Sequence, residues 1–375
     1  MKGIAPRGSR IAAPLLVAAF SLALFGKAAE AASVALHETG SSLVYPLFEL
    51  WIPDYKAQHP DVDITAGATG SGDGIAKAIA GAVQIGTSDA YMSEDAAEQN
   101  PQILNIPLAI SAQTVNYNLP GLSAPLKLDG PVLSGIYGGT ITSWDAPRIA
   151  ALNPGLTLPH HAIVPVHRAD ASGDTFIFTQ FLDFSTQSGD DEIGYDPSAS
   201  TPTVPGSPAA MGYDMSVNWP VVPGAQTAVG NAGMVHTLAT TPYSVGYVGI
   251  SFHAAIAKAG LGTALIKNQN GKFLLPTPET ISAAAAVLDP RTPADERLTL
   301  VFAAGDDSYP LINYEYAIVS KQQADDTTAE AVRQFLLWAI AADGGNAPKY
   351  LNSVGFIPLP DFIRGLSEAQ VVLVH

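Results

Sequence analysis

The sequence predicts an α/β fold with largely parallel sheets. Short runs rich in Val and Ile alternate with longer segments whose apolar residues recur at helical spacing, and small-residue turns separate the two. We find no internal repeat and no coiled-coil heptad. Of the 375 residues, 47% are hydrophobic and 14% are charged, which is typical of a globular chain with a sizeable buried core.

The N-terminal segment is typical of a secretory signal peptide. Lys2, Arg7 and Arg10 precede the apolar run "IAAPLLVAAFSLALF", and small residues follow up to a cleavage pattern at 29–31. The apolar run has 15 residues, fewer than the ~20 needed to cross a bilayer, and no later segment is long and apolar enough. We therefore expect residues 1–31 to be removed on export and the remainder to have no stable membrane insertion.

The exported chain is strongly acidic and contains no cysteine. It can form no disulfide and offers no cysteine for a lipid anchor. The whole chain has a formal net charge of -16; removal of residues 1–31 takes away four of 18 basic and one of 34 acidic residues, which leaves -19. Nucleic acids and anionic lipids require basic patches, so neither is expected as a partner.

Strands and helices alternate from the start of the exported chain. The first three expected strands, "VALHETG", "DVDITAG" and "VQIGTSDA", occupy residues 34–40, 61–67 and 83–90. The first two are followed by small-residue turns and helical patterns. In the middle of the chain, "AIVPVHRADASGDTFIFTQFL" (162–182) again predicts a strand, a turn and a helix.

The second half of the chain contains a long region rich in Gly, Pro, Ser and Asp. It runs from about 184 to 233 and predicts surface loops, after which a strand resumes at "SVGYVGISF". The segments "QTVNYNLPG" (113–121) and "LINYEYAIVS" (311–320) are expected to be extended and to pair with each other as two crossings between domains. A helix is expected in "DDTTAEAVRQFLLWAIA" near the C-terminus.

Three turns share one design, in which a strand ends in a Gly- and Ser-rich turn that opens a helix. They are "TGSSLVYPLF", "TGSGDGIAKA" and "ADASGDTFIF". The first turn of a helix has unpaired N–H groups and the positive end of the helix dipole, and small residues let an anion approach closely. Serine at a helix start is also an ordinary N-cap. Three such turns, with Arg168 beside the third, indicate an anion site more strongly than any one alone.

Other chemistries fit these residues less well. None of the turns carries the lysine of a P-loop, and Asp73 would repel a nucleotide phosphate. "GTSDA" departs from the nucleophile-elbow pattern. The spacing of His160, His161 and His167 matches no common metal motif. We therefore expect a protein that is not an enzyme and that has neither a metal site nor a cofactor.

Five motifs in this order resemble those of the periplasmic phosphate-binding proteins of bacterial phosphate-specific ABC transporters: "TGSSLVYPLFELW", "GATGSGDGI", "IGTSDA", "HRADASGDTF" and "SVGYVG". The resemblance runs from about Val34 to the C-terminus. It implies a two-domain, type II Venus-flytrap fold with hinge strands crossing twice. Domain I would comprise 32–116 plus 311–375, and domain II 117–310. It further implies a periplasmic monomer that binds inorganic phosphate and delivers it to an inner-membrane ABC permease.

The resemblance also assigns site residues position by position. Asp89 matches the carboxylate that accepts a hydrogen bond from a phosphate hydroxyl, Arg168 matches the cationic ligand, and Asp170 matches the residue that orients the arginine. An ionised carboxylate only accepts hydrogen bonds, so Asp89 would select a protonated oxyanion over sulfate. The full set of implied phosphate-binding residues is Ser42, Leu43 (through its backbone), Ser71, Asp89, Arg168, Ser172, Gly173 and Asp174.

Asp174 stands where many members of that family have threonine. Its carboxylate either faces the ligand as a second acceptor, which would favour the doubly protonated monoanion, or points away and caps Phe176 or Ile177. Two functional alternatives stay open beside phosphate capture. One is binding of another protonated oxyanion, such as arsenate; the other is a secreted phosphatase-like hydrolase, although the three serines are better placed as hydrogen-bond donors than as nucleophiles.

Overall fold

A mixed sheet runs through the protein, which we describe from a computed structural model at residues 1–3, 33–122, 124–186 and 212–375. Within these ranges the strands of this sheet are β1 (Val34–Gly40), β2 (Val62–Thr65), β3 (Ile85–Ser88), β4 (Ile103–Tyr117), β6 (Val164–Arg168), β7 (Gln226–Ala228), β8 (Ser244–Gly249), β9 (Gly262–Thr263) and β12 (Ile312–Ser320). A smaller sheet consists of β5 (Lys127–Leu128), β10 (Leu265–Lys267) and β11 (Phe273–Leu274).

The large sheet has the strand order β2-β1-β3-β12-β4-β8-β6-β7, and β9 pairs with β4. The pairs at its two ends, β2–β1–β3 and β8–β6–β7, are parallel. The central pairs, β3–β12–β4–β8, are antiparallel. The α/β prediction is confirmed, but the sheet is parallel only at its ends because β4 and β12 run against their neighbours.

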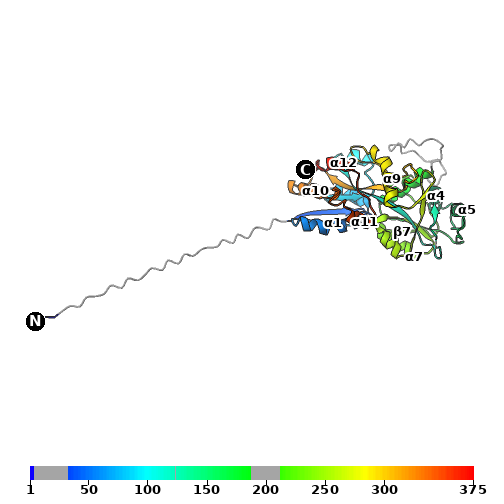
Figure 1. Cartoon of the computed structure of the whole chain (residues 1–375), viewed down its shortest axis with the longest axis horizontal. Coiled ribbons are helices and arrows are strands. Elements are labelled where there is room, and N and C mark those ends of the chain that lie inside the picture. The colour runs from blue at the N-terminus through cyan, green and yellow to red at the C-terminus, as the bar shows by residue number, and fades with distance from the viewer. Residues whose placement is uncertain (4–32, 123, 187–211) are drawn as a thin grey trace. The chain divides into compact units, whose positions relative to one another are not determined.

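Helices surround this sheet (Figure 1). They are α1 (Tyr45–Gln58), α2 (Ser71–Ile79), α3 (Glu94–Gln99), α4 (Gly130–Tyr137), α5 (Pro147–Leu152), α6 (Gly173–Thr186), α7 (Gly230–Thr240), α8 (His253–Lys258), α9 (Pro278–Leu288), α10 (Asp326–Ile340), α11 (Pro348–Val354) and α12 (Asp361–Val371), with 3-10 turns at Ile250–Phe252 and Asp289–Arg291. Figure 1 shows α1, α10 and α12 near one end of the sheet, and α4, α5 and α7 near the other.

Strand β4 is fully buried along its 15 residues and changes partner in the middle. Its first part pairs with β12, from Ile103↔Ser320 to Ala112↔Ile312, and its last five residues pair with β8. The expected pairing of 113–121 with 311–320 is therefore wrong in register. These two segments meet only at their starts, where the Gln113 N–H donates to the carbonyl of Leu311 (2.9 Å). The prediction failed because β4 begins at Ile103, ten residues before the segment recognised in the sequence, and those ten residues are the ones that pair with β12.

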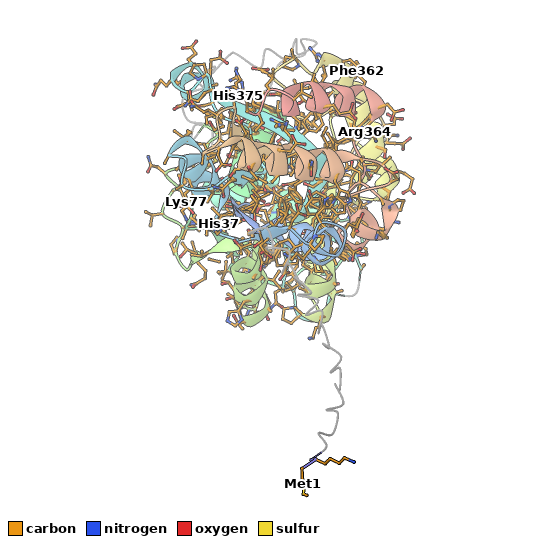
Figure 2. The ribbon with its side chains drawn as sticks, turned by 90° about the vertical axis from the view of Figure 1, so that its left-hand side faces the viewer. Met1, His37, Lys77, Phe362, Arg364 and His375 are labelled. Atoms are coloured by element: carbon orange, nitrogen blue, oxygen red, sulfur yellow. The ribbon has the colours of Figure 1, made fainter. Side chains whose placement is uncertain are left out.

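Helices from the beginning and the end of the folded unit share one apolar core. Rings of α1 and α10 pack edge to face, with the centroids of Trp51 and Phe335 6.2 Å apart. The Trp51 indole N–H also donates to the carbonyl of Gly345 (2.9 Å). The helix expected near the C-terminus is thus confirmed as α10, and its apolar face is buried. Phe362 of α12, by contrast, lies at the surface and is 57% exposed (Figure 2).

The candidate site lies where several strands end. Strands β1, β3, β6 and β7 each deliver the chain to a turn at their carboxyl ends, and α1, α6 and α7 begin a few residues after β1, β6 and β7. Parallel strands place such turns at the same edge of a sheet, so the turns after β1 and β3 lie together, as do those after β6 and β7. The two groups of strands run in opposite directions, because three antiparallel pairings separate them. Hydrogen bonds from Gly72 to Ala171 and from Asn231 to Ser42 join the turns of one group to those of the other.

Some expectations fall outside what the structure describes. Of the expected signal peptide, only residues 1–3 are described, and of the expected loop region, residues 187–211 are not. The predicted end of that loop region, at about residue 233, is wrong, since β7 and the start of α7 lie before it. Residues 33–375 pack as one compact unit, and the bounds given above for the two domains stay a prediction. No helix among the described residues has the length and apolarity to cross a bilayer.

Candidate functional site

The structure brings all nine predicted site residues into one buried cluster. The second and third turns touch directly, because the Gly72 N–H donates to the carbonyl of Ala171 (3.0 Å). The first turn is joined to α7, where Asn231 donates to the Ser42 hydroxyl from its backbone and side chain (3.0 Å each). Apart from Asp170, which is half-buried, these residues are buried: Ser42, Leu43, Ser71, Asp89, Arg168, Ser172, Gly173 and Asp174.

Arg168, at the end of β6, is the cation of the cluster. Its guanidinium makes a two-pronged contact with Asp170, in which Nε donates to Oδ1 (2.7 Å) and Nη2 donates to Oδ2. Nη1 donates to Oδ2 of Asp174 (2.7 Å). Burial alone would lower the pKa of Arg168, but its contacts with the two aspartates raise it, so the side chain stays charged. The expected role of Asp170 in orienting the guanidinium matches this geometry.

Asp170 is itself held in place from a second direction. The Gly230 N–H, at the start of α7, donates to its Oδ1 (3.2 Å). Burial raises the pKa of Asp170, but the hydrogen bond and the charge of Arg168 outweigh this effect and lower it overall. Asp170 is therefore ionised near neutral pH, and the guanidinium is fixed in its plane.

The carboxylate of Asp174 points into the cluster. Its Oδ2 accepts from Arg168 and from Nδ2 of Asn231 (2.7 Å each), and its Oδ1 accepts from Nε2 of Gln113 (2.9 Å). The alternative in which it points away and caps Phe176 or Ile177 is wrong, because its hydrogen-bond partners are Arg168, Asn231 and Gln113, and the Phe176 N–H donates to the carbonyl of Ser172 (3.1 Å). Three side-chain donors outcompete the local cap, so the second negative charge lies next to Arg168.

Asp89 follows β3 and is surrounded by hydroxyl groups. Ser41 donates to its Oδ1, and Ser71 donates to its Oδ2 (3.3 Å). Burial is the main effect that raises the pKa of Asp89, followed by the charge of Asp174; hydrogen bonds from Ser41 and Glu315, and the charge of Arg168, act in the opposite direction. Asp89 thus titrates closer to neutrality than an exposed aspartate.

Gly173 allows the third turn to approach Asp89. A Cβ at this position would lie 2.7 Å from the Cβ and Oδ2 of Asp89 and from Oγ of Ser71. Contacts this short do not occur, so a side chain here would force the turns apart. Helix α6 begins at Gly173, and the N–H groups of its first turn have no carbonyl one turn earlier to pair with. Ser172 accepts from the Thr175 N–H (3.3 Å), as an ordinary N-cap does.

Four site residues were missed by sequence reasoning: Ser41, Gln113, Asn231 and Glu315. Ser41 adjoins the predicted Ser42. Asn231 follows a strand of three residues, too short to show alternation, although Gly230 before it has the positive φ of +64° that marks a turn. Gln113 and Glu315 lie in apolar strands, where a buried amide and a buried carboxyl are the signals that could have found them.

The rings of the three histidines considered above contact residues outside this cluster, except that Nδ1 of His167 also contacts the carbonyl of Arg168 (3.2 Å). His160 is exposed and contacts Asp145 (2.7 Å), His161 stacks on Tyr243, and His167 stacks on Trp219. Burial lowers the pKa of His167. In the described part of the chain, no group of three or more His, Cys, Asp or Glu side chains is arranged to hold a metal ion.

Comparisons with known proteins identify the family of the chain. A model of the PBP superfamily domain matches residues 26–343. The chain is 30% identical to the phosphate-binding protein PstS of Methanocaldococcus jannaschii, over 91% of this chain and 87% of the relative. It is 31% identical to the protein of the same name from Pasteurella multocida, over 88% of each.

Solved structures show the same fold at low sequence identity. A phosphate-binding protein from Stenotrophomonas maltophilia is 20% identical, with a TM-score of 0.65 over 90% of this chain and 94% of the other. A high-affinity periplasmic phosphate-binding protein, solved with phosphate, is 19% identical with a TM-score of 0.65, over 90% and 93%. These likenesses establish the two-domain periplasmic-binding-protein fold.

Proposed function

We propose that this chain, which belongs to the PstS family of phosphate-binding proteins within the PBP superfamily, binds inorganic phosphate and delivers it to an ABC-type permease. One observation carries the proposal: the buried guanidinium of Arg168, fixed by Asp170, lies among the starts of three helices and three serine hydroxyls. Such a cluster supplies the planar cation and the short neutral donors that a phosphate group requires.

The donors of the site divide by charge. Arg168 supplies the cationic contact, and Ser42, Ser71 and Ser172 supply hydroxyls. The backbone N–H groups of Leu43, in the turn before α1, and of Gly173, the first residue of α6, complete the set; the Leu43 N–H donates to the Ser41 hydroxyl (3.0 Å) in this structure. Neutral donors let the site hold an anion without adding to its positive charge, in a protein whose overall charge repels anions.

Asp89 gives the site its selectivity. When it is ionised it can only accept hydrogen bonds, so it pairs with an oxyanion that still carries a proton and repels one that does not. Sulfate has no such proton near neutral pH. A site that requires a ligand hydroxyl can reject an analogue lacking it by a factor of about 10⁴. Arsenate carries protons as phosphate does, and serves as a competitor in the test below.

We further propose that residues 32–116 with 311–375 form one domain and 117–310 the other, and that the two close on phosphate by a hinge motion. The change of partner of β4 at Gln113, opposite Leu311, supports a hinge at this point. The closed form is the one that a permease can recognise. We also propose that residues 1–31 direct export to the periplasm, where the protein acts as a monomer without a lipid anchor.

The family is one of solute-binding proteins, and the site supports binding rather than hydrolysis. Each serine has a structural hydrogen bond: Ser42 accepts from Asn231, Ser71 donates to Asp89 and Ser172 accepts from Thr175. None of the three has a histidine partner among the described residues. Turnover of a phosphate ester that disappears in Arg168→Ala would contradict this conclusion.

Calorimetric titration tests the proposed function. The purified protein, freed of ligand by unfolding and refolding, is titrated with phosphate, arsenate and sulfate at pH 5.5 and pH 8. We expect micromolar or tighter phosphate binding, about -8 kcal/mol or more negative, and no heat with sulfate. A folded sample that binds no phosphate would mean that the three turns only cap their helices.

A further inference from the structure

A second carboxyl group is buried directly behind Asp89. Glu315 lies in the middle of β12 and is 0% exposed. Strand β12 pairs with β3, with Tyr316 opposite Ser88, and this register places Glu315 beside the residue that follows β3. Its Oε1 accepts from the Ser111 hydroxyl (2.5 Å) and from Nδ2 of Asn313 (3.0 Å).

The other oxygen of Glu315 is oriented differently. Oε2 is buried, and no N–H or O–H group of the described residues donates to it. The strand register and the hydrogen bond from Nδ2 of Asn313 to the carbonyl of Asp89 (3.2 Å) place this side chain beside Asp89, and each carboxyl group shifts the pKa of the other. Two carboxyl groups buried side by side do not both ionise near neutral pH, because their charges repel. An ionised carboxylate has no donor, so a pair that holds one proton both relieves the repulsion and supplies a hydrogen bond between the two groups.

The surroundings decide which residue carries it. Asp89 accepts from Ser41 and Ser71 and lies within the field of Arg168, so its ionised form is stabilised. Glu315 has only the two donors on Oε1, and burial followed by the charge of Asp89 raises its pKa. The charged groups facing the pair are Arg168 and Asp174, from β6 and α6. The neighbouring groups are the neutral hydroxyls of Ser41 after β1, Ser71 in α2 and Ser111 in β4.

We propose that Glu315, held in its protonated form, donates a hydrogen bond to Asp89 while keeping its proton, and so keeps Asp89 ionised as the acceptor that recognises a proton on the ligand. This inference rests on the proposed function, and it makes Glu315 a positioning residue that determines specificity without touching phosphate. Without this donor, Asp89 takes up a proton itself on acidification. A protonated Asp89 donates instead of accepting, and it no longer rejects sulfate.

Phosphate and sulfate titrations across pH test the proposal with three variants. In Glu315→Leu, we expect sulfate binding to appear at pH 5.5, and phosphate affinity to fall about tenfold more between pH 8 and pH 5.5 than in the wild type. Glu315→Gln keeps an N–H donor and should retain the wild-type profile. Glu296→Leu is the matched control, since this buried glutamate contacts Ser367 and Gln370 instead of Asp89.

The same pH profile in Glu315→Leu and in the wild type would overturn the proposal. Loss of affinity that is equal at all pH values would also overturn it, because that pattern indicates a purely structural role. Wild-type binding of phosphate at pH 8 tests the proposed function separately, so the failure of one can be told from the failure of the other.

Infrared spectroscopy locates the proton even if Glu315→Leu fails to fold. The difference spectrum between the wild type and Glu315→Gln at pH 7, without phosphate, should show the loss of a protonated-carboxyl band. Loss of an ionised-carboxylate band instead would show that Glu315 is charged, and the proposal would fall.

Discussion

On one side of the candidate site two carboxylates share a guanidinium, and on the other side two carboxyl groups share a proton. Asp170 and Asp174 both contact Arg168. Asp89 and Glu315 lie beside each other, and the groups that donate to them are hydroxyls and an amide. The difference shows that burial by itself does not set the charge of a carboxyl group. A cation in contact with a carboxyl group keeps that group ionised. Where only neutral groups donate, the two carboxyl groups retain one proton, and small differences in their surroundings decide which of them carries it.

Removing the cation should have the largest effect. Arg168→Met leaves two buried carboxylates without their partner, which costs about 3–5 kcal/mol of folding free energy for a buried ion pair. Phosphate affinity should fall at least about a hundredfold, since a buried charged contact is lost. Urea unfolding measures the first effect and calorimetry the second.

Arg333→Met is the matched control for this change. Arg333 pairs with Glu330 near the surface, where an ion pair contributes less than about 1 kcal/mol. Its phosphate affinity should stay at the wild-type level. Wild-type phosphate affinity in Arg168→Met would show that the guanidinium only holds the two aspartates.

A buried carboxyl group outside the site extends the comparison. Glu38 accepts from the Thr87 hydroxyl (2.5 Å) and has no contact with a cation among the described residues. Burial is the main cause that raises its pKa, to about 8, against the opposing hydrogen bonds. The folded protein therefore keeps this proton between about pH 4.5 and pH 8, while the unfolded chain loses it.

It follows that stability falls as the pH rises through this window. Without phosphate, unfolding free energy should be a few kcal/mol larger at pH 5 than at pH 8, by about 1.4 kcal/mol for each unit of pKa difference. Glu296, whose pKa burial also raises to about 8, contributes in the same direction. Glu38→Gln should reduce the difference, measured by urea unfolding at both pH values; exposed Glu330→Gln should not. An unchanged difference in Glu38→Gln would mean that Glu38 is ionised in the folded protein.

Asp174→Thr should have the smallest effect and the most specific one. It removes one of the negative charges around Arg168, so phosphate affinity at pH 8 should rise or stay the same. The wild type should retain its affinity better on acidification, by about tenfold between pH 8 and pH 5.5, because two carboxylates match two ligand hydroxyls. Calorimetry at both pH values measures this ratio. Equal pH profiles for the two proteins would show that Asp174 only balances the charge of Arg168.

Local sequence pattern was sufficient for the parts of the site that are local. The first strand was predicted at residues 34–40, as observed, and the turns that carry Ser42, Ser71 and Ser172 each sit in one strand–turn–helix unit. Such units can be recognised from the spacing of apolar residues and from small residues in the turn, all within about fifteen positions of the sequence. The assignment of individual ligands needed the family resemblance as well.

The contacts that join distant segments could not be predicted in this way. Gln113 reaches Asp174 across 61 positions, and Asn231 reaches Ser42 across 189. The pairing register of β4 and β12 also depends on residues some 200 positions apart, and an apolar strand gives no local sign of its partner. The proton shared by Asp89 and Glu315 depends on that register, so it becomes visible only once the sheet is assembled.

The position of β12 has a consequence for the order of assembly. This strand lies between β3 and β4, which do not pair with each other in the sheet, yet it is made almost 200 residues after β4. Until it arrives, the centre of the sheet has a gap, and closing that gap requires a long-range loop with a high entropic cost. A nascent chain shorter than about 320 residues therefore lacks a finished core. Tight packing of the core therefore waits for one of the last strands to emerge, which delays it until synthesis is almost complete.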